Sequence, residues 1–425
     1  MKVVSTKSTS TKPRIVVLGA GFGGLYTVKE LLWYFRNEEE VDITVVNQTN
    51  YFLFTPMLHE VATGSVGHHQ VVESLRELLY QTKVKLVTTE VGTVDLAKKI
   101  VTTKQGPINF DYLVIALGST TNFYGVPGAD KYTITLKNLR DAITLRARII
   151  ESFEKAANTT DPVKRKELLT FGVIGGGPTG VELVAEMGEL FWDNIIKMYP
   201  GVFKPNEVRL YLFSQAPELL TQMHQSLRTE ALRVLKERGI DVHLASTITE
   251  VKKDGVMLSG KTFIQMGTII WAAGTTPNTP KFKQAVELDP GQRIMANELL
   301  QVNGWSNVYT LGDVASVVDK KTNRPLPMLA QVAVRQADIV AYNLAEEIRG
   351  TKNFQSFKYL SMGSLVSLGQ WNAVAEMMFI RFSGRLAWYL WRTIYLFKFI
   401  SWEKRFKIAL DWTLGIFSYR DITKA

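Results

Sequence analysis

Two stretches of the chain repeat one pattern, in which a run of apolar residues ends at closely spaced glycines and is followed by apolar residues at helical intervals. The first stretch is "RIVVLGAGFGGLYTVKELLW" and the second is "LLTFGVIGGGPTGVELVAEM". Each predicts a buried β-strand, a glycine turn and a helix. The glycines of both turns have the spacing GxGxxG and are Gly19, Gly21 and Gly24 in the first, and Gly175, Gly177 and Gly180 in the second.

Glycines with this spacing have a chemical use between a strand and a helix. The first makes the tight turn, the second lets the backbone approach a pyrophosphate, and the third lets the helix pack closely on the strand. A phosphate is then held at the helix N-terminus. A single copy is a weak signal, but two correctly placed copies predict two dinucleotide sites. A permanently bound flavin nucleotide and a visiting nicotinamide nucleotide fit this arrangement.

Three further strand ends agree with two dinucleotide sites. In "NVYTLGDVAS", Gly312 and Asp313 follow an apolar strand, where a carboxylate can accept hydrogen bonds from a flavin ribityl chain. The strands in "DYLVIALGST" and "TIIWAAGTTPN" end in small-residue turns at Gly118 and Gly274. Such turns allow the chain to cross a bound dinucleotide or to leave one domain for the next.

The order of these patterns predicts an α/β protein with two Rossmann-like domains, the second inserted into the first. Residues 13–124 and 278–350 are expected to form the first of these domains, and residues 125–277 the second. Residues 351–425 are expected to form a separate C-terminal region that associates with a membrane.

Composition narrows the chemistry. With 425 residues, 46% of them hydrophobic, the chain can bury a large core. It has no cysteine, which excludes disulfides, thiolate metal sites and iron–sulfur clusters. The histidines, including His68 and His69, lack ligand spacing and are interpreted as surface or loop residues, so no metal site is expected. The polar, basic residues 1–14 predict a disordered tail.

The C-terminal region has a composition of its own. The net charge is +10, and from Arg381 onward nine Lys and Arg stand against three Asp and Glu, a surplus of six. The run "LAWYLWRTIYLFKFI" is shorter than the roughly 20 apolar residues of a membrane span and contains Arg392 and Lys398. It is therefore not expected to cross a bilayer. Nothing here indicates a nucleic-acid partner.

An amphipathic helix is predicted from Trp402 onward. One side carries Phe406, Ala409, Thr413 and Phe417, and the other carries Lys404, Lys407, Asp411 and Ser418. The tryptophans among these basic residues are Trp388, Trp391, Trp402 and Trp412. This composition predicts a helix pair in the headgroup layer of an anionic lipid surface. The alternatives are packing of these helices on the protein's own core, or a homodimer interface.

Nearly the whole chain resembles the type II NADH:quinone oxidoreductases. The resemblance rests on both glycine motifs, on "GDVA" at 312–315 and on three more particular segments. These are "NYFLFTPMLHEVATG" at 50–64, "AQVAVRQ" at 330–336 and "GSLVSLGQWNAVAE" at 363–376. The missing cysteines agree, because disulfide reductases of the same fold and sulfide:quinone oxidoreductases need thiols, whereas a flavin that reduces a quinone directly does not.

The resemblance implies that residues 13–124 and 278–350 are the FAD-binding domain and that residues 125–277 are the NAD(P)H-binding domain. It implies oxidation of NADH and two-electron reduction of a membrane quinone to quinol without proton pumping. It also implies a peripheral protein on the cytoplasmic face of the inner or plasma membrane. The residues expected to bind FAD are Gly19, Gly21, Phe22, Gly23, Gly24, Asn47, Gly118, Gly312 and Asp313. Those expected on the nicotinamide nucleotide are Gly175, Gly177, Gly180, Ser214, Gln215 and Gly274.

Glu182 and Gln331 are the expected catalytic residues, with Gln331, Arg335 and Gln336 as the quinone candidates. In the family's AQxAxQ motif the second glutamine is replaced by Arg335, and Gln336 follows it, so Gln331 is the strongest candidate. Glu182 follows the second glycine motif. It is expected to contact nicotinamide or ribose and to relay protons, with a capping or packing role as the alternative.

The expected choice of nucleotide follows from residues that differ from the pattern of a NAD-specific domain. A NAD-specific domain has an acid at the end of its second strand, which binds the ribose 2′-hydroxyl and repels a 2′-phosphate. Ser214 and Gln215 stand there instead, and Asn47 stands at the matching place in the first domain. NADPH is therefore expected as a second substrate, with discrimination of no more than about 2 kcal/mol, unless Glu218 replaces the acid.

Two other functions share these motifs. A soluble NAD(P)H-dependent flavin reductase of a small electron-transfer protein would have both glycine turns, but it would not need the aromatic, basic C-terminal region. An FAD- and NADH-binding redox sensor that changes its oligomeric state would have no use for Gln331.

Overall fold

The computed structural model describes residues 12–36, 40–378 and 380–423. Most of the segment expected to be a disordered tail, residues 1–11, lies outside this part of the chain. The chain divides into two compact units. The first unit comprises residues 1–52, 74–120 and 276–360, and the second comprises residues 53–73, 121–275 and 361–425.

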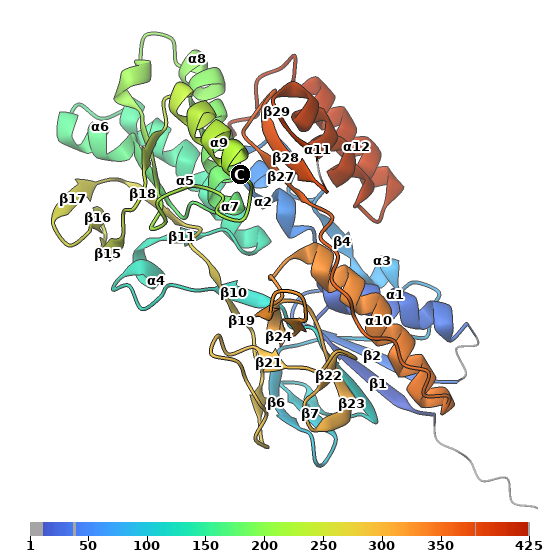
Figure 1. Ribbon diagram of the computed structural model, residues 1–425. Coiled ribbons are helices and arrows are strands. Elements are labelled where there is room, and N and C mark those ends of the chain that lie inside the picture. The colour runs from blue at the N-terminus through green and yellow to red at the C-terminus, as the bar shows by residue number, and fades with distance from the viewer. Residues whose placement is uncertain (1–11, 37–39, 379, 424–425) are drawn as a thin grey trace, which may run out of the picture. The chain divides into compact units, whose positions relative to one another are not determined.

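A six-stranded sheet forms the centre of the first unit, with the order β22-β23-β9-β1-β2-β5 (Figure 1). All neighbouring strands are parallel except β22 and β23. The strands are β1 (Arg14–Leu18), β2 (Asp42–Asn47), β5 (Lys85–Thr88), β9 (Tyr112–Ile115), β22 (Gln301–Val302) and β23 (Trp305–Thr310). The central strands are almost wholly apolar because both faces of the sheet are covered.

Helices and a smaller sheet complete the first unit. Helix α1 (Phe22–Tyr34) packs along α10 (Ala330–Arg349), and the short helix α3 spans Leu75–Leu78. The second sheet, of order β20-β6-β7-β8, covers the other side of a core that includes Leu18, Phe110 and Leu113. Its strands are β6 (Val91–Asp95), β7 (Ile100–Thr103), β8 (Gly106–Asn109) and β20 (Lys281–Phe282). Three short pairs of strands are β21 (Ile294–Met295) with β24 (Ala315–Ser316), β25 (Val318–Asp319) with β26 (Arg324–Pro325), and β3 (Tyr51–Leu53) with β4 (Val72–Ser74).

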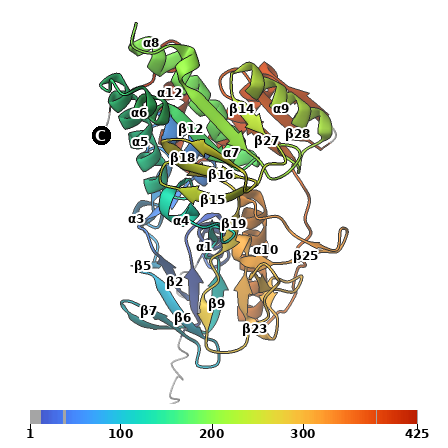
Figure 2. The same cartoon turned by 90° about the vertical axis from the view of Figure 1, so that its left-hand side faces the viewer.

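The second unit has a five-stranded parallel sheet of order β11-β18-β12-β13-β14 (Figure 2). Its strands are β11 (Ile134–Thr135), β12 (Thr170–Ile174), β13 (Arg209–Phe213), β14 (Asp241–His243) and β18 (Thr268–Trp271). An antiparallel sheet adds β15 (Ile248–Lys252), β16 (Gly255–Leu258) and β17 (Thr262–Gln265). The segments β10 (Ser119–Thr121) and β19 (Thr275–Pro277) lie where the chain passes between the units.

The helices of the second unit surround its sheet. They are α2 (Leu58–Thr63), α4 (Ala129–Tyr132), α5 (Leu139–Ala157), α6 (Pro162–Leu168), α7 (Pro178–Gly188), α8 (Ile196–Met198) and α9 (Gln225–Glu237). Helix α5 starts at a capping box, in which the Asn138 side chain accepts from the Asp141 backbone N–H and the Asp141 carboxylate accepts from that of Asn138. A π-helical segment, Glu189–Ile195, continues α7. Such segments are rare and often occur at functional sites.

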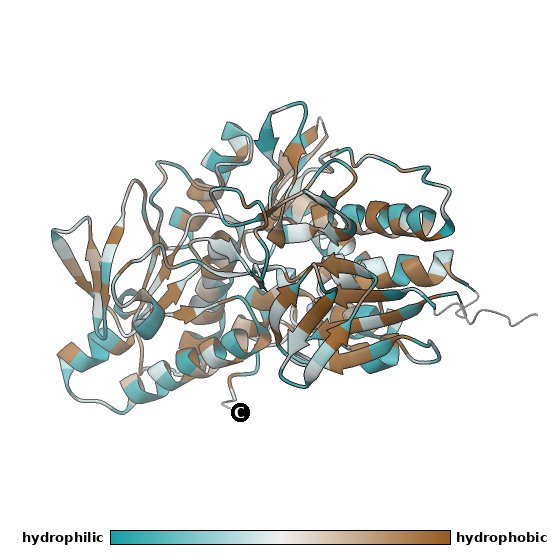
Figure 3. Ribbon diagram, turned by 90° about the horizontal axis from the view of Figure 1, so that it is seen from below, coloured by the Kyte–Doolittle hydropathy of each residue, from teal (hydrophilic) through white to brown (hydrophobic). Residues whose placement is uncertain are grey.

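Residues 351–425 were expected to form a separate region, but residues 351–360 belong to the first unit and residues 361–425 to the second. A three-stranded antiparallel sheet, β27 (Ser364–Ser367), β28 (Ala373–Met377) and β29 (Ile380–Ser383), packs against α9 and α11 (Arg385–Phe397). Helix α12 (Trp402–Leu414) lies beside α11. Apolar and polar residues form separate bands along the helices, as Figure 3 shows. The expected domain limits near 124 and 278 lie close to the observed crossings, but residues 53–73 were expected in the first domain.

Candidate functional sites

The first glycine turn has the geometry that a dinucleotide requires. Gly19 has a φ of 93°, and a Cβ there would collide with the Ala116 carbonyl oxygen. A Cβ on Gly24 would collide with the Gly19 carbonyl, so α1 packs directly on the turn. At Gly21, by contrast, a Cβ would meet nothing within 4 Å, which leaves this backbone open to a ligand. The turn therefore fits the pyrophosphate of FAD at the N-terminus of α1.

Asn47 supports this turn from the end of β2. Its Oδ1 accepts a hydrogen bond from the backbone N–H of Ala20 at 2.9 Å, and its Nδ2 donates to the Thr49 carbonyl at 2.8 Å. Phe22 and Gly23 begin α1, where the Phe22 ring packs edge-on against Phe52 at 5.1 Å. The side chain of Asn47 thus fixes the shape of the glycine turn.

The Gly312–Asp313 turn is held by two side chains. The hydroxyl of Ser119, which follows Gly118 after β9, donates to Asp313 Oδ2 at 2.5 Å. Gln336 from α10 accepts a hydrogen bond from the Gly312 N–H at 2.8 Å and is buried. Gln336 is therefore committed to the turn that carries the expected flavin-binding aspartate.

The other two quinone candidates also lie on α10. Arg335 donates to the Leu360 carbonyl at 2.6 Å, which ties it to the end of the first unit. Gln331 lies half-buried in the first turn of α10. Of the three candidates, Gln331 is the one placed at the N-terminus of the helix.

The second glycine turn repeats the geometry of the first. Gly175 has a φ of 131°, and a Cβ on Gly180 would collide with the Gly175 carbonyl, whereas a Cβ on Gly177 would meet nothing within 4 Å. Gly274, with a φ of 114°, lies against the Tyr124 hydroxyl. Gly175, Gly177 and Gly274 line a pocket of about 590 Å³ in the second unit. The pocket is also lined by Ser214, Gln215, Ala216, Glu218, Ser246, Thr247 and Trp271.

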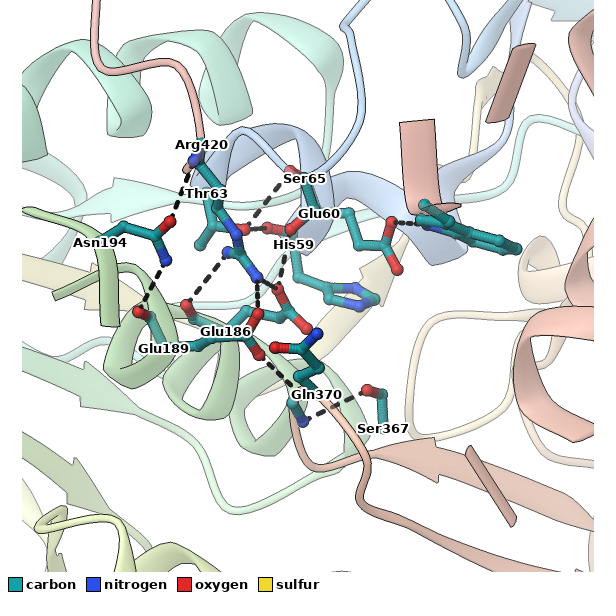
Figure 4. Close-up of polar contacts among 12 residues, drawn as sticks. His59, Glu60, Thr63, Ser65, Glu186, Glu189, Asn194, Ser367, Gln370 and Arg420 are labelled. Atoms are coloured by element: carbon teal, nitrogen blue, oxygen red, sulfur yellow. Dashed lines mark hydrogen bonds and ion pairs between the residues drawn. The ribbon is translucent and has the colours of Figure 1, made fainter. Parts of the chain in front are cut away.

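A cluster of buried acids lies along α7, the helix that follows the second glycine turn (Figure 4). Glu182, Glu186 and Glu189 follow one face of α7 and the start of the π-helical segment, and Glu60 comes from α2. Each of the four is less than 9% exposed. They are called the acidic cluster below.

Arg420 is the central cation of the acidic cluster. Its guanidinium donates to Glu186 at 2.8 Å and to Glu189 at 2.5 Å, and its backbone N–H donates to Asn194 at 2.9 Å. Ser65 donates to Glu186 at 2.9 Å. The segment around Arg420 is thereby fixed to α7 and the π-helical segment.

Glu182, Glu189 and Glu60 also accept hydrogen bonds from C-terminal residues. The backbone N–H groups of Ser367 and Gln370 donate to Glu182 at 3.1 Å and to Glu189 at 2.6 Å. The indole of Trp412 donates to Glu60 at 2.7 Å. The segment at 363–376, which the sequence marked only by resemblance, thus has a physical role in holding buried carboxylates.

Burial changes the protonation of these groups. It raises the pKa of Glu182 to about 8, and burial together with Glu186 raises the pKa of Glu60 to about 8. Burial and the charge of Arg420 lower the pKa of His59 to about 3. His59 Nδ1 lies 3.9 Å from Glu182, but both groups are neutral near pH 7, so this contact is not an ion pair.

His59 corrects one expectation from the sequence. It was grouped with surface or loop histidines, but it is 3% exposed and its ring packs against Trp391. Among the described residues, no group of three His, Cys, Asp or Glu is arranged to hold a metal ion.

The expectation that four tryptophans face lipid is wrong for three of them. Trp388, Trp391 and Trp412 are at most 6% exposed, and only Trp402, at 77%, faces outward. Arg392 lies 3.8 Å from the Trp388 ring, as a cation on an aromatic face. Arg392, one of the two cations within the apolar run, therefore faces inward.

Lys404 also packs inward. It was expected on the polar outer side of the helix, but it donates to the His69 carbonyl at 3.0 Å and lies near Glu73. No described helix is both long enough and apolar enough to span a bilayer.

Two parallel sheets with two open glycine turns define a pyridine nucleotide-dependent flavoprotein with two dinucleotide-binding domains. Residues 13–337 match the family model of pyridine nucleotide-disulphide oxidoreductases, and residues 361–421 match that of the NDH2 C-terminal domain. The chain belongs to the type II NADH:quinone oxidoreductases.

Individual relatives agree with this assignment. The chain is 30% identical to the type II NADH:quinone oxidoreductase Ndh of Mycobacterium tuberculosis, over 98% of this chain and 90% of that protein. It is also 30% identical to a probable NADH dehydrogenase of Dictyostelium discoideum, over 96% and 91% of the two chains. The structure of NDH2 from Plasmodium falciparum in complex with NADH has the same fold, with a TM-score of 0.89 and 22% identity over 97% of this chain and all of that one.

The protein is therefore an FAD-dependent enzyme that oxidises NADH and reduces a membrane quinone, without proton pumping. The predicted family, fold class, cofactors and reaction are confirmed.

Proposed function

We propose that the first glycine turn holds FAD and that the 590 Å³ pocket of the second unit holds the adenosine side of NADH. When bound, the flavin supplies the hydride acceptor and passes two electrons on to the quinone. The overall balance is NADH plus one proton plus quinone, giving NAD⁺ and quinol. The observation that carries this proposal is the second glycine turn, which has the same open backbone at Gly177 as the first has at Gly21.

Glu182 is proposed to supply or hold the proton that this balance requires. It is a buried residue of α7, the helix that follows the second glycine turn, and it is neutral near pH 7 because its pKa is raised to about 8. A neutral carboxylic acid can donate a proton, whereas an ionised one cannot. The backbone N–H of Ser367 holds one of its oxygens and so fixes its orientation.

Gln331 is proposed to position the quinone. An amide can donate to a quinone carbonyl without changing its own charge. Gln331 lies in the first turn of α10, whereas Arg335 and Gln336 lie about one turn further along this helix.

Turnover tests these roles. The purified protein is expected to oxidise NADH rapidly with a soluble quinone and slowly with a small iron–sulfur protein as acceptor. Rapid reduction of the iron–sulfur protein together with slow reduction of the quinone would contradict the proposal. Reduction of the bound flavin by NADH, followed in a stopped-flow instrument, separates nucleotide binding from quinone reduction.

The outer face of α12 is proposed to bind the cytoplasmic surface of the inner or plasma membrane. Trp402, Phe406, Leu410 and Leu414 recur every four residues along it, and each is at least 45% exposed. Leu386, Tyr389 and Phe397 form an exposed row on α11. An apolar row of this length on a basic segment fits a lipid surface, into which it can insert between headgroups.

Flotation with vesicles tests the membrane proposal. Phe406→Ser with Leu410→Ser is expected to leave the FAD content unchanged and to move the protein from vesicles of anionic lipid to the soluble fraction. Val163→Ser, at an exposed apolar position on α6, is the matched control. Unchanged flotation together with a change from dimer to monomer would show that a second copy, and not lipid, covers this face.

A further inference from the structure

Residues at and after the end of β13 form one wall of the 590 Å³ pocket. Ser214 occupies the position where a NAD-selective domain has an acid. It is 3% exposed, its N–H donates to the His243 carbonyl at 2.9 Å, and its own carbonyl accepts from Ser246 at 2.8 Å. A Cβ on Gly176 would lie 2.5 Å from the Ser214 hydroxyl. Ser214 is thus packed beneath the glycine turn and brings no charge to the pocket.

The charge in this pocket comes from a different residue. Glu218, four positions further along the chain, is the only ionisable acid or base among the described lining residues, apart from the phenol of Tyr124. Its carboxylate forms an ion pair with Arg228 of α9. The Glu218 side chain is 41% exposed and that of Arg228 is 24% exposed. Both groups are therefore accessible from solvent, and Glu218 lines the pocket.

Arg228 has unused hydrogen-bonding capacity. Its Nε is buried and has no hydrogen-bond partner among the described residues, while one terminal nitrogen contacts Glu218. A guanidinium with free N–H groups is well suited to a phosphate. The pair thus combines a carboxylate that repels a 2′-phosphate with a cation that would bind one.

We propose that Glu218 selects NADH over NADPH in this enzyme, and that Arg228 limits how strong this selection is. Glu218 accepts a hydrogen bond from the ribose 2′-hydroxyl and repels a 2′-phosphate, while the neighbouring guanidinium cancels part of that repulsion. The acid that contacts the ribose is therefore Glu218, four residues after the position that Ser214 occupies at the end of β13. The inference rests on the proposed assignment of NADH to this pocket.

Steady-state kinetics of the full-length, FAD-loaded enzyme test the inference. The ratio of kcat/KM for NADH to that for NADPH is measured at saturating soluble quinone for the wild type, Glu218→Gln, Arg228→Gln and the double variant. Glu218→Gln is expected to raise kcat/KM for NADPH by about tenfold or more and to change that for NADH by less than about fivefold. Arg228→Gln is expected to lower kcat/KM for NADPH by about fivefold or more in both backgrounds.

Matched controls come from α9 itself. Glu237 and Arg233 form an ion pair on its exposed face, so Glu237→Gln and Arg233→Gln make the same chemical changes away from the pocket. Both are expected to leave the ratio unchanged. FAD content and circular dichroism identify any variant that fails to fold.

Two failures are distinguishable. If NADH reduces the flavin of the wild type normally but Glu218→Gln leaves the ratio within twofold, Glu218 does not select the nucleotide and the inference is overturned. If neither nucleotide protects the pocket residue Glu218 from carbodiimide modification while flavin reduction proceeds, NADH binds elsewhere and the pocket assignment falls as well.

Discussion

Replacing Glu60 with glutamine is expected to stabilise the protein at neutral and alkaline pH. Glu60 is 3% exposed, and its Oε2 accepts a hydrogen bond from Trp412 at 2.7 Å, which a glutamine oxygen can also accept. The titratable and charged groups that face it are Glu182 and Glu186 from α7, Arg392 from α11 and Arg420. Burial, followed by the charge of Glu186, raises its pKa from 4.5 to about 8.

The direction in which the free energy of unfolding changes with pH follows from proton binding. Between the two pKa values the folded protein holds a proton that the unfolded chain has lost, so the free energy of unfolding falls as the pH rises. The stabilisation that the bound proton gives the folded protein is fully present below a pH of 4.5 and is lost as the pH rises to about 8. Relative to a neutral side chain, such an acid costs roughly 1 kcal/mol at about pH 5 and roughly 4 kcal/mol at about pH 7.5. The gain from Glu60→Gln is therefore expected to grow by about 3 kcal/mol between these values.

Urea unfolding followed by tryptophan fluorescence measures this gain, because Trp391 and Trp412 lie beside the acidic cluster. Glu403→Gln is the matched control, since Glu403 is exposed on α12 and pairs with Lys407. Its unfolding free energy is expected to follow that of the wild type at every pH. Parallel curves for Glu60→Gln and the wild type would show that Glu60 is ionised in the folded protein, which would refute the reasoning.

Three further changes test the roles of individual residues. Gln331→Ala is expected to slow turnover with quinone by about tenfold or more while NADH still reduces the flavin at the wild-type rate; equal slowing of both steps, measured by stopped flow, would make Gln331 structural. Arg420→Gln is expected to cost about 3–5 kcal/mol in urea unfolding because it removes the guanidinium that contacts both Glu186 and Glu189 in the interior, whereas the exposed control Lys407→Gln is expected to cost less than about 1 kcal/mol. Gly180→Ala is expected to abolish flavin reduction by NADH and to retain FAD, because the added methyl collides with the Gly175 carbonyl; normal NADH binding in this variant would contradict the role of the second turn.

The parts of the fold that follow from local patterns could be predicted from the sequence. Both strand–turn–helix units, including the open position at Gly21, are set by residues adjacent in the chain. The chain crosses between the units at residues 120–121 and 275–276, next to the turns at Gly118 and Gly274.

The parts that depend on distant partners could not be predicted. Trp388 and Arg392 read as membrane-interface residues because their neighbours are apolar and basic, but each is the other's partner in the folded unit. Truncation after Arg381 would therefore remove core residues, and it is not a selective test of membrane binding. A signal for the acidic cluster was present, since Glu182, Glu186 and Glu189 recur at helical spacing along an otherwise apolar helix.

The hydrogen bond between Glu60 and Trp412 joins positions 352 residues apart, which has a consequence for biosynthesis. At about 5–20 residues per second, a ribosome needs roughly 20–70 s to travel between them. Throughout that interval Arg420, which follows Trp412 in the chain, is not yet available to Glu186 and Glu189. The nascent second unit must therefore keep this part of α7 hydrated or protected by a chaperone until residues 412–420 have been made. A chain that stops before Arg420 would have complete nucleotide-binding motifs but would lack the guanidinium that contacts these two buried carboxylates.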